Sequence, residues 1–294
     1  MEAVEPLRRR VDVLQELREV VKTMKTIAAV TIRQYEKAVV SLRRYSRTIE
    51  MGMQVVMRGR EAGLEMQPVS GRCLTMIVFG SEFGMCGQFN EVLTSFALSK
   101  CKELQIPERD RSVIAVGTRA LSSLEEIGAQ VESWVALPGS VGGITSRVQE
   151  LLSKIEDWQC RGGTGRIMLF HNEPVSGLIY HPKAVAFLPI EMEWQGSLEQ
   201  KAWPSRVLPT FTMGRLQLIH ALLRQYLFVI LYRAFAESLA SENMARLACM
   251  QAAEDNIEDR LQELRLQYNQ LRQAAITEEL LDIVAGFEVL TEKP

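Results

Sequence analysis

The chain has 294 residues, of which 47% are hydrophobic, and its 34 Lys and Arg nearly balance its 36 Asp and Glu. That length can hold one large domain or two modest ones with an ample core, and the charge balance gives no general case for binding nucleic acid. Five scattered cysteines form no Cys-x-x-Cys pair, and three histidines make no metal-ligand spacing with them. We therefore expect reduced thiols and neither a zinc site nor disulfides.

The N-terminal segment, MEAVEPLRRRVDVLQELREV, has no apolar signal-peptide core. The most apolar stretch further along is LLRQYLFVILYRAF, in which Arg224 and Arg233 bracket only eight uncharged residues. A bilayer requires about 20 apolar residues. The sequence therefore predicts a soluble chain whose only link to a membrane runs through a partner.

Between Pro6 and Arg60 the chain has no further proline, and its apolar residues follow a 4-3 register. The register comprises Leu7, Val11, Leu14, Val21, Ala28, Ile32, Tyr35, Val39 and Leu42. A second apolar stripe runs beside it through Val13, Leu17, Val20, Met24 and Ile27. Both patterns predict one long helix over this segment.

A longer uninterrupted segment runs from Arg215 to about Ala285 and predicts a second helix of roughly 105 Å. Its coiled-coil seam comprises Ile257, Leu261, Leu264, Tyr268, Leu271 and Ala275. Residues 8–60 hold 13 Lys/Arg and 5 Asp/Glu, net +8, whereas residues 237–288 hold 4 Arg and 11 Asp/Glu, net −7. Opposite charge favours pairing of the two helices and disfavours self-pairing of either one.

The middle of the chain alternates short apolar runs with amphipathic segments. The runs of strand length are Leu74–Phe79, Val113–Gly117, Ile167–Phe170 and Ala184–Leu188, and the helical segments are Glu91–Leu104, Arg119–Ile127 and Ser146–Trp158. This alternation predicts a parallel-type sheet with helices on its faces. Segments rich in Pro, Gly and polar residues suggest boundaries that give an N-terminal helix at 1–66, an α/β domain at 67–209 and a C-terminal helix at 210–294.

The stretch FGSEFGMCGQ at 79–88 raises the question of a nucleotide site, since a strand, a glycine loop and a helix can wrap backbone amides around a phosphate. It matches neither G-x-G-x-x-G nor the P-loop, and Glu82 places a carboxylate where a phosphate would lie. A structural turn is the favoured interpretation. The alternative, an enzyme with coiled-coil arms, requires nucleotide binding at this loop or nucleophilic chemistry at Cys86.

The basic N-terminal helix leaves three interpretations open. Its positive residues are interrupted by Asp12, Glu16, Glu19 and Glu36 and have no accompanying series of aromatic residues. A solvated coiled-coil face and a surface for an acidic protein partner are favoured equally. Nucleic-acid binding is the third hypothesis and predicts salt-dependent retention on DNA or RNA. Near the other end, Arg272 and Gln273 interrupt the heptads, which suits either a solvated helix end or a contact site.

Three regions resemble the gamma subunit of F-type rotary ATP synthases. The resemblance is strongest in LYRAFAESLASENMARLACMQAAEDN (231–256) and ELRLQYNQLRQAAITEELLDIVAG (263–286). It is also clear in RRRVDVLQELREVVKTMKTIAAVTIRQYEKA (8–38) and in FGSEFGMCGQFN (79–90). It implies a long antiparallel coiled coil of the terminal helices plus a central Rossmann-like α/β domain. It also implies a rotor shaft that carries torque between the membrane c ring and the catalytic beta subunits.

By the same resemblance, the partners are the alpha and beta subunits, epsilon and the c ring, at the cytoplasmic face of a bacterial membrane, with no nucleic acid, cofactor or active site in this chain. Met24 and Lys25 match a segment that faces an acidic beta-subunit lever. The residues that match a polar set in contact with a beta-subunit loop and the neighbouring helix are Arg272, Gln273, Thr277 and Glu279. Gly84, Cys86 and Gly87 match a structural glycine loop.

The chain departs from the family in two places. The family loop usually carries Asp followed by Arg or Lys before Gly-Leu-Cys-Gly, whereas this chain has Glu82, Phe83, Gly84, Met85, Cys86 and Gly87. The segment 190–209, where contacts to epsilon and the c ring are expected, also fits poorly. These departures suggest a divergent branch of the family. An inserted loop with paired cysteines is not seen, so thiol regulation is not expected.

Overall fold

The computed structural model describes residues 4–57, 73–160, 165–189, 203–204 and 207–291. Two compact units emerge, one of Ala28–Arg246 and one that combines Met1–Ile27 with Leu247–Pro294. The long helices α1 (Val4–Met57) and α6 (Arg215–Thr291) contribute to both units. Each unit is described by itself below.

The larger unit contains a five-stranded sheet in the order β3-β2-β1-β4-β5. Its strands are β1 (Cys73–Phe79), β2 (Arg111–Val116), β3 (Val131–Val135), β4 (Gly165–Ser176) and β5 (Ile179–Leu188). The first four are parallel and β5 is antiparallel to β4. The connecting elements are α2 (Phe89–Glu103), η1 (Glu108–Asp110), α3 (Thr118–Glu126), η2 (Val141–Gly143) and α4 (Ile144–Cys160). The predicted α/β architecture is confirmed, with two corrections.

Both corrections concern the edges of the sheet. The sequence predicted a parallel-type sheet, but only the two residues Gly177 and Leu178 join β4 to β5, and so short a turn forces antiparallel pairing. Gly177 supplies the positive φ of 64° that this turn uses. The edge strand β3, with sequence VESWV, was missed because its alternating exposure produces no apolar run.

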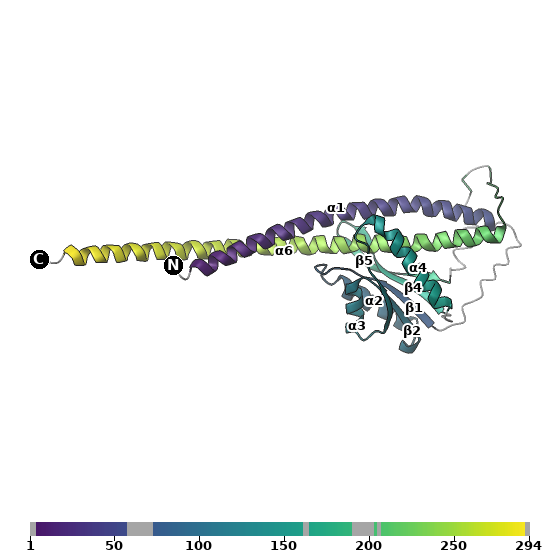
Figure 1. The fold of residues 1–294 in the computed structure, drawn as a ribbon, viewed down its shortest axis with the longest axis horizontal. Helices are drawn as coiled ribbons and strands as arrows, with labels where there is room; N and C mark the ends of the chain where they lie inside the picture. Colours follow the sequence, from purple (N-terminus) through teal and green to yellow (C-terminus); the bar gives the residue numbers. More distant parts are fainter. Residues whose placement is uncertain (1–3, 58–72, 161–164, 190–202, 205–206, 292–294) are drawn as a thin grey trace. The chain divides into compact units, whose positions relative to one another are not determined.

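Each face of the sheet packs on different helices (Figure 1). Alternate residues of β1 point to opposite faces, as a strand requires. Leu74, Met76 and Val78 pack with α2 and α3, while Ile77 and Phe79 pack with α4, α1 and α6. The middle of α6 is therefore a core helix of this domain as well as part of a long helical pair.

Within this unit α1 and α6 run antiparallel. The Nε of Arg215 donates to the Val56 carbonyl at 2.9 Å, and Tyr45 Oη donates to Gln225 at 3.0 Å. The predicted register of α1 is confirmed here, since Ala28, Ile32, Tyr35 and Val39 are all buried.

The second unit pairs the start of α1 with the last part of α6, also antiparallel. Val21 packs against Met250, Ile257 and Leu261, and Arg18 pairs with Glu258 at 2.6 Å. Leu264 is also buried. These contacts confirm the predicted pairing of the basic helix with the acidic one.

The seam ends earlier than predicted. Tyr268 is half-buried and Leu271 is 40% exposed. The described part of α1 begins at Val4, and its first turns cover α6 only loosely, with Leu7 half-buried. Four residues of the second predicted apolar stripe of α1 are also exposed to solvent, namely Val13, Leu17, Val20 and Ile27.

The first sequence boundary, near residue 66, falls in 58–72, outside the described residues. The divergent segment 190–209 is described only at 203–204 and 207–209, and the boundary at 209/210 lies in the coil that precedes α6. By length and composition α6 is apolar enough to cross a membrane, with a window of mean hydropathy 1.3. Leu231, Ala234 and Phe235 of this helix are buried against the sheet, so packing explains its apolar character.

Candidate functional site

Met24 and Lys25 lie on α1 within the paired-helix unit. Met24 is half-buried and packs against the cluster around Val21 and Met250. The Lys25 ammonium pairs with the Glu254 carboxylate of α6. The hydrogen bond from Lys25 holds the pKa of Glu254 below its usual value. In the single chain this cation therefore already has an acidic partner.

The polar set of the C-terminal helix lies in the same unit and is exposed. Arg272, Gln273, Thr277 and Glu279 all face solvent, and the Thr277 hydroxyl donates to the Gln273 carbonyl of its own helix at 2.8 Å. Their apolar neighbours are exposed too, among them Leu271, Ile276, Leu280 and Ile283. The uncovered end of α6 thus mixes polar and apolar side chains.

The structure does not bring the two predicted sets together. Lys25 meets α6 at Glu254, which lies 18 residues before Arg272. At about 1.5 Å per residue this separates the two places by roughly 27 Å along α6. They form two separate candidate contact areas.

The glycine loop after β1 is fixed by close packing. A Cβ on Gly80 would lie 2.4 Å from the Ala120 Cβ, and one on Gly117 would lie 2.6 Å from the Ser81 carbonyl. Gly87 has a φ of 60°. By contrast, a Cβ on Gly84 would approach only the Arg119 guanidinium, at 3.6 Å. Tight approach therefore requires glycine at both strand ends, and backbone conformation favours it at Gly87.

Polar groups of the loop are used within the protein. Asn90 accepts from the Ser81 N–H and donates to the Ser81 hydroxyl, both at 2.9 Å. The Glu82 carboxylate accepts from the Leu137 N–H at 3.0 Å, and Thr118 donates to the Glu82 carbonyl. These bonds leave the loop organised around its own side chains rather than as an open cradle for phosphate.

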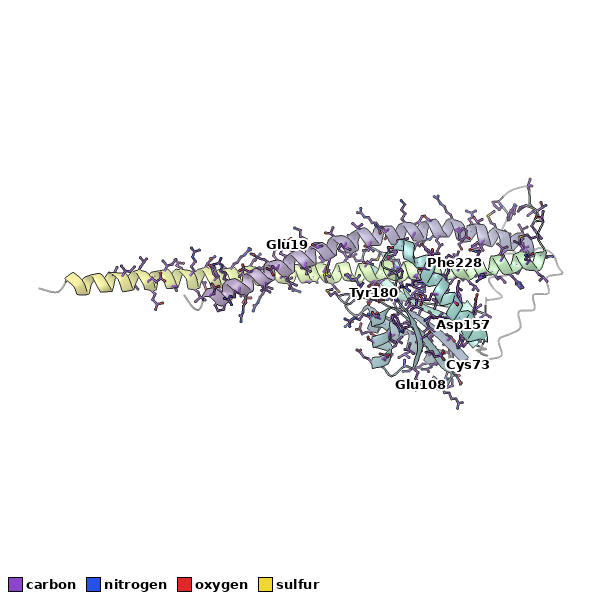
Figure 2. All side chains as sticks on the ribbon, viewed as in Figure 1. Glu19, Cys73, Glu108, Asp157, Tyr180 and Phe228 are labelled. Carbon is purple, nitrogen blue, oxygen red and sulfur yellow. The ribbon has the colours of Figure 1, made fainter. Side chains whose placement is uncertain are left out.

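Cys86 is buried at the base of this loop. It packs with Phe89, Ala245 and Tyr180, the last at the start of β5 (Figure 2). Its Sγ lies 3.5 Å from the Ser81 hydroxyl, and no histidine belongs to this cluster. The environment is that of a small buried residue. Among the described residues, no group of three His, Cys, Asp or Glu side chains could hold a metal ion.

A buried polar stretch of α6 was missed as a site. Residues 231–246 include five buried polar side chains, namely Glu237, Ser238, Ser241, Glu242 and Asn243. Such residues within a long apolar helix could have indicated a polar contact with another element, because buried polar groups require partners.

Glu237 belongs to a charged cluster beside the sheet. His171 Nε2 lies 3.0 Å from its Oε2, and Arg233 donates to its Oε1 at 2.6 Å. Burial alone would raise the pKa of Glu237, but the hydrogen bonds from His171 and Arg233 outweigh burial and lower it. His171, Arg233 and Glu237 line a cleft of about 400 Å³ between β4, β5 and α6.

At Glu242 burial outweighs the hydrogen bonds, so its pKa is raised rather than lowered. Its side chain is buried, Arg246 donates to the carboxylate at 2.6 Å, and Glu82 of the glycine loop influences it electrostatically. Burial raises the pKa of Glu242 to about 7, the Glu82 charge adds to this, and Arg246 opposes it. This carboxyl therefore titrates near neutral pH at the contact between α6 and the glycine loop.

The fold and these contacts define a class of protein in which two long antiparallel helices carry an α/β domain. A family model described as ATP synthase matches residues 3–290. The chain belongs to that ATP synthase family, and the resemblance inferred from its sequence is confirmed.

Curated relatives agree over the full length. The ATP synthase gamma chain of Polaromonas sp. (strain JS666) is 28% identical, and the match covers 97% of this chain and 99% of the relative. The ATP synthase gamma chain of Herpetosiphon aurantiacus is 26% identical over 99% of this chain and all of the relative. Both matches therefore run through the two long helices and the intervening domain of this chain.

The fold is also similar to that of chains in solved ATP synthase structures. A chain of the Euglena gracilis mitochondrial ATP synthase, from a structure of OSCP, F1 and c ring, matches with a TM-score of 0.63 at 18% identity. That match covers 98% of this chain and 95% of the other. A chain from the Tetrahymena thermophila central stalk and c ring matches with a TM-score of 0.54 at 15% identity, covering 80% of this chain and 99% of the other.

Proposed function

We propose that this chain is the central rotor shaft of an F-type ATP synthase and transmits torque between the membrane c ring and the catalytic beta subunits. The observation that carries the proposal is the match to gamma chains over 97% of this chain and 99% of the relative. The segments 1–66, 67–209 and 210–294 then serve as first shaft helix, foot domain and second shaft helix. Coupling of ion flow to ATP synthesis or hydrolysis depends on this one connected chain.

The proposed partners are the alpha and beta subunits of the catalytic hexamer, epsilon and the c ring. The uncovered apolar residues Val13, Leu17 and Val20 on α1, and Ile276 and Leu280 on α6, support a shaft enclosed by other subunits. Both curated relatives are bacterial proteins, which supports a peripheral position at the cytoplasmic face of the cell membrane. Contact with the bilayer would run only through the c ring.

The chain itself would have no catalytic role and bind no cofactor. This is supported by the glycine loop, whose Ser81 N–H and Glu82 carboxylate are engaged within the protein. Gly84, Cys86 and Gly87 would be structural members of this loop. ATP chemistry would take place on the beta subunits.

Met24, Lys25, Arg272, Gln273, Thr277 and Glu279 would be the residues that contact the beta subunits and transmit torque. Exposure of the last four supports contact with another chain. Lys25 pairs with Glu254 here, so a beta-subunit carboxylate would have to compete for the same ammonium. Such exchange suits a bond that is formed in one rotary state and broken in the next.

Co-expression with alpha and beta subunits of a related operon tests the proposal. We expect a complex with one copy of this chain and ATPase activity, and neither turnover nor saturable nucleotide binding by the purified chain alone. Saturable nucleotide binding that is lost in Gly80→Ala would instead support the enzyme hypothesis. Salt-dependent retention on DNA would support the nucleic-acid hypothesis.

A further inference from the structure

One face of α6 carries three buried polar residues that contact the sheet domain. Ser238, Ser241 and Glu242 are spaced i, i+3 and i+4, which puts them on the same side of a helix. Both serines are fully buried and Glu242 is 3% exposed. We call these three residues the α6 polar face.

The two serines donate to main-chain carbonyls of neighbouring strands. Ser238 Oγ donates to the Phe79 carbonyl at 2.9 Å, at the last residue of β1. Ser241 Oγ donates to the Asn172 carbonyl of β4 at 3.0 Å, opposite Pro182, which has no N–H to donate. Serines within helices often bond to their own helix, as Ser41 does with the Lys37 carbonyl. On the α6 polar face the hydroxyls instead join α6 to the sheet.

Glu242 extends these contacts to the glycine loop. Arg246 of α6 itself donates to its carboxylate at 2.6 Å, and Glu82, three residues after β1, is close enough to influence it electrostatically. Beside it Phe79 packs edge-to-face on Phe235, with ring centroids 5.0 Å apart. The α6 polar face therefore contacts β1, the loop that follows β1, and β4.

Hydrogen bonds fix a helix against a sheet in a way that apolar packing does not. Apolar contacts are non-directional, whereas hydrogen bonds weaken steeply when distance or angle changes. A helix that carries torque experiences a force that would turn it relative to the domain. Bonds to fixed carbonyls resist such movement both along and around the helix.

We infer that Ser238, Ser241 and Glu242 are positioning residues that keep the α/β domain at a fixed angle on α6 under load, so that torque passes between them without slip. This inference rests on the proposed rotor function. It assigns transmission to a buried contact within the chain, separate from the residues proposed to meet the beta subunits. The polar face acts through α6 and contacts neither substrate nor ion.

The test is Ser238→Ala with Ser241→Ala, assembled in the complete ATP synthase in membrane vesicles. The ratio of ATP-driven ion pumping to ATP hydrolysis should fall by roughly threefold or more, since each lost hydrogen bond shifts an equilibrium by about that factor. The loss should grow against an opposing ion gradient, because load then acts on the contact. The single variants should each show a smaller loss. An unchanged ratio in the single variants, or in the double variant where it assembles, would overturn the inference.

Two control variants separate slip from simple destabilisation. Val148→Ala removes volume from the same buried cluster on α4 without touching the α6 polar face. It should lower thermal stability but keep the coupling ratio at every gradient. An equal loss of coupling in Val148→Ala would overturn the inference. Ser41→Ala removes an exposed hydroxyl from α1 and should change neither quantity. Failure of the wild-type chain to assemble and pump would instead contradict the proposed function.

Discussion

Two glycines of the loop after β1 differ in what surrounds them. At Gly80 a side chain would meet the Ala120 Cβ at 2.4 Å and Asn90 Oδ1 at 2.5 Å, and Asn90 also holds the Ser81 N–H. At Gly84 the nearest atom belongs to the exposed, flexible Arg119 side chain. The sequence motif contains both glycines, but only the structure shows that Gly80 has no room for a side chain and that Gly84 has room for one.

We therefore expect Gly80→Ala to lower the free energy of unfolding by roughly 2–3 kcal/mol, because the Ala120 and Asn90 contacts must shift. Gly84→Ala is the matched control and should change it by less than about 0.5 kcal/mol. Urea unfolding of the two purified variants measures both effects. Equal stability of the two variants would show that the loop does not pack as described.

Glu242 gives a pH-dependent prediction. Its native pKa of about 7 lies above the ordinary value of 4.5, so the native state favours the protonated form. The free energy of unfolding should fall as pH rises from about 4.5 to about 7 and then level, by roughly 3 kcal/mol for this group, at about 1.4 kcal/mol per pH unit. Glu242→Gln removes that dependence, so the variant should gain stability relative to wild type across this window.

Urea unfolding at about pH 4 and about pH 8 compares the two proteins. Glu126 is exposed, so Glu126→Gln serves as the control. Its free energy of unfolding should change between the two pH values by as much as that of wild type. If the free energy of unfolding of Glu242→Gln also changes with pH as that of wild type does, the Glu242 carboxyl is not buried against the glycine loop.

At the scale of elements, the pairing of α1 with α6 has a defined end. Leu261 is 2% exposed, whereas Leu271 is 40% exposed, although both belong to the same heptad register. Leu261→Ala should lower the free energy of unfolding of the isolated chain by roughly 2–5 kcal/mol, through lost burial and a cavity. Leu271→Ala should cost less than about 0.5 kcal/mol.

In the assembled complex, the same two variants test whether other subunits cover the end of α6. If other subunits cover the end of α6, Leu271→Ala should weaken assembly although it leaves the isolated chain unaffected. Measurements of unfolding and of co-purification on the same two variants check this. A large loss of stability in the isolated Leu271→Ala chain would mean that the seam continues beyond Leu264.

The sequence predicted most elements because each strong pattern was local. The 4-3 register of the long helices and the apolar runs of β1 and β2 reflect burial that neighbouring residues share. The half-exposed β3 and the antiparallel direction of β5 were not predicted, since both depend on position in the sheet. The early end of the seam depends on how tightly α1 packs there, which the heptads of α6 alone do not encode.

The candidate sites were less predictable. Exposure of Arg272 and its neighbours fits a contact site, and the heptad break at this place was visible in the sequence. The pairing of Lys25 with Glu254 was not foreseen, because charge totals do not identify individual pairs. Ser238 and Ser241 gave no short motif at all, since their partners are main-chain atoms more than 60 residues away.

At the scale of the whole molecule, the chain combines a well-buried α/β domain with helical surfaces that leave apolar residues open. Val13 and Leu17 on α1, and Ile276 and Leu280 on α6, are each at least 46% exposed. In a monomeric protein such apolar residues are normally buried. In a shaft enclosed by a ring of subunits they form the surface that the other subunits contact. The α6 contact with the sheet domain would connect that shaft to the foot.

The most direct measurement is single-molecule rotation of a complex of this chain with alpha and beta subunits. A bead would be attached to Cys73, an exposed cysteine at the start of β1, after the other thiols are replaced. On addition of ATP the account predicts rotation in one direction, with three pauses per turn that reflect the threefold ring. An ATP-hydrolysing complex that contains the chain but whose bead shows only undirected fluctuation would contradict the rotor function.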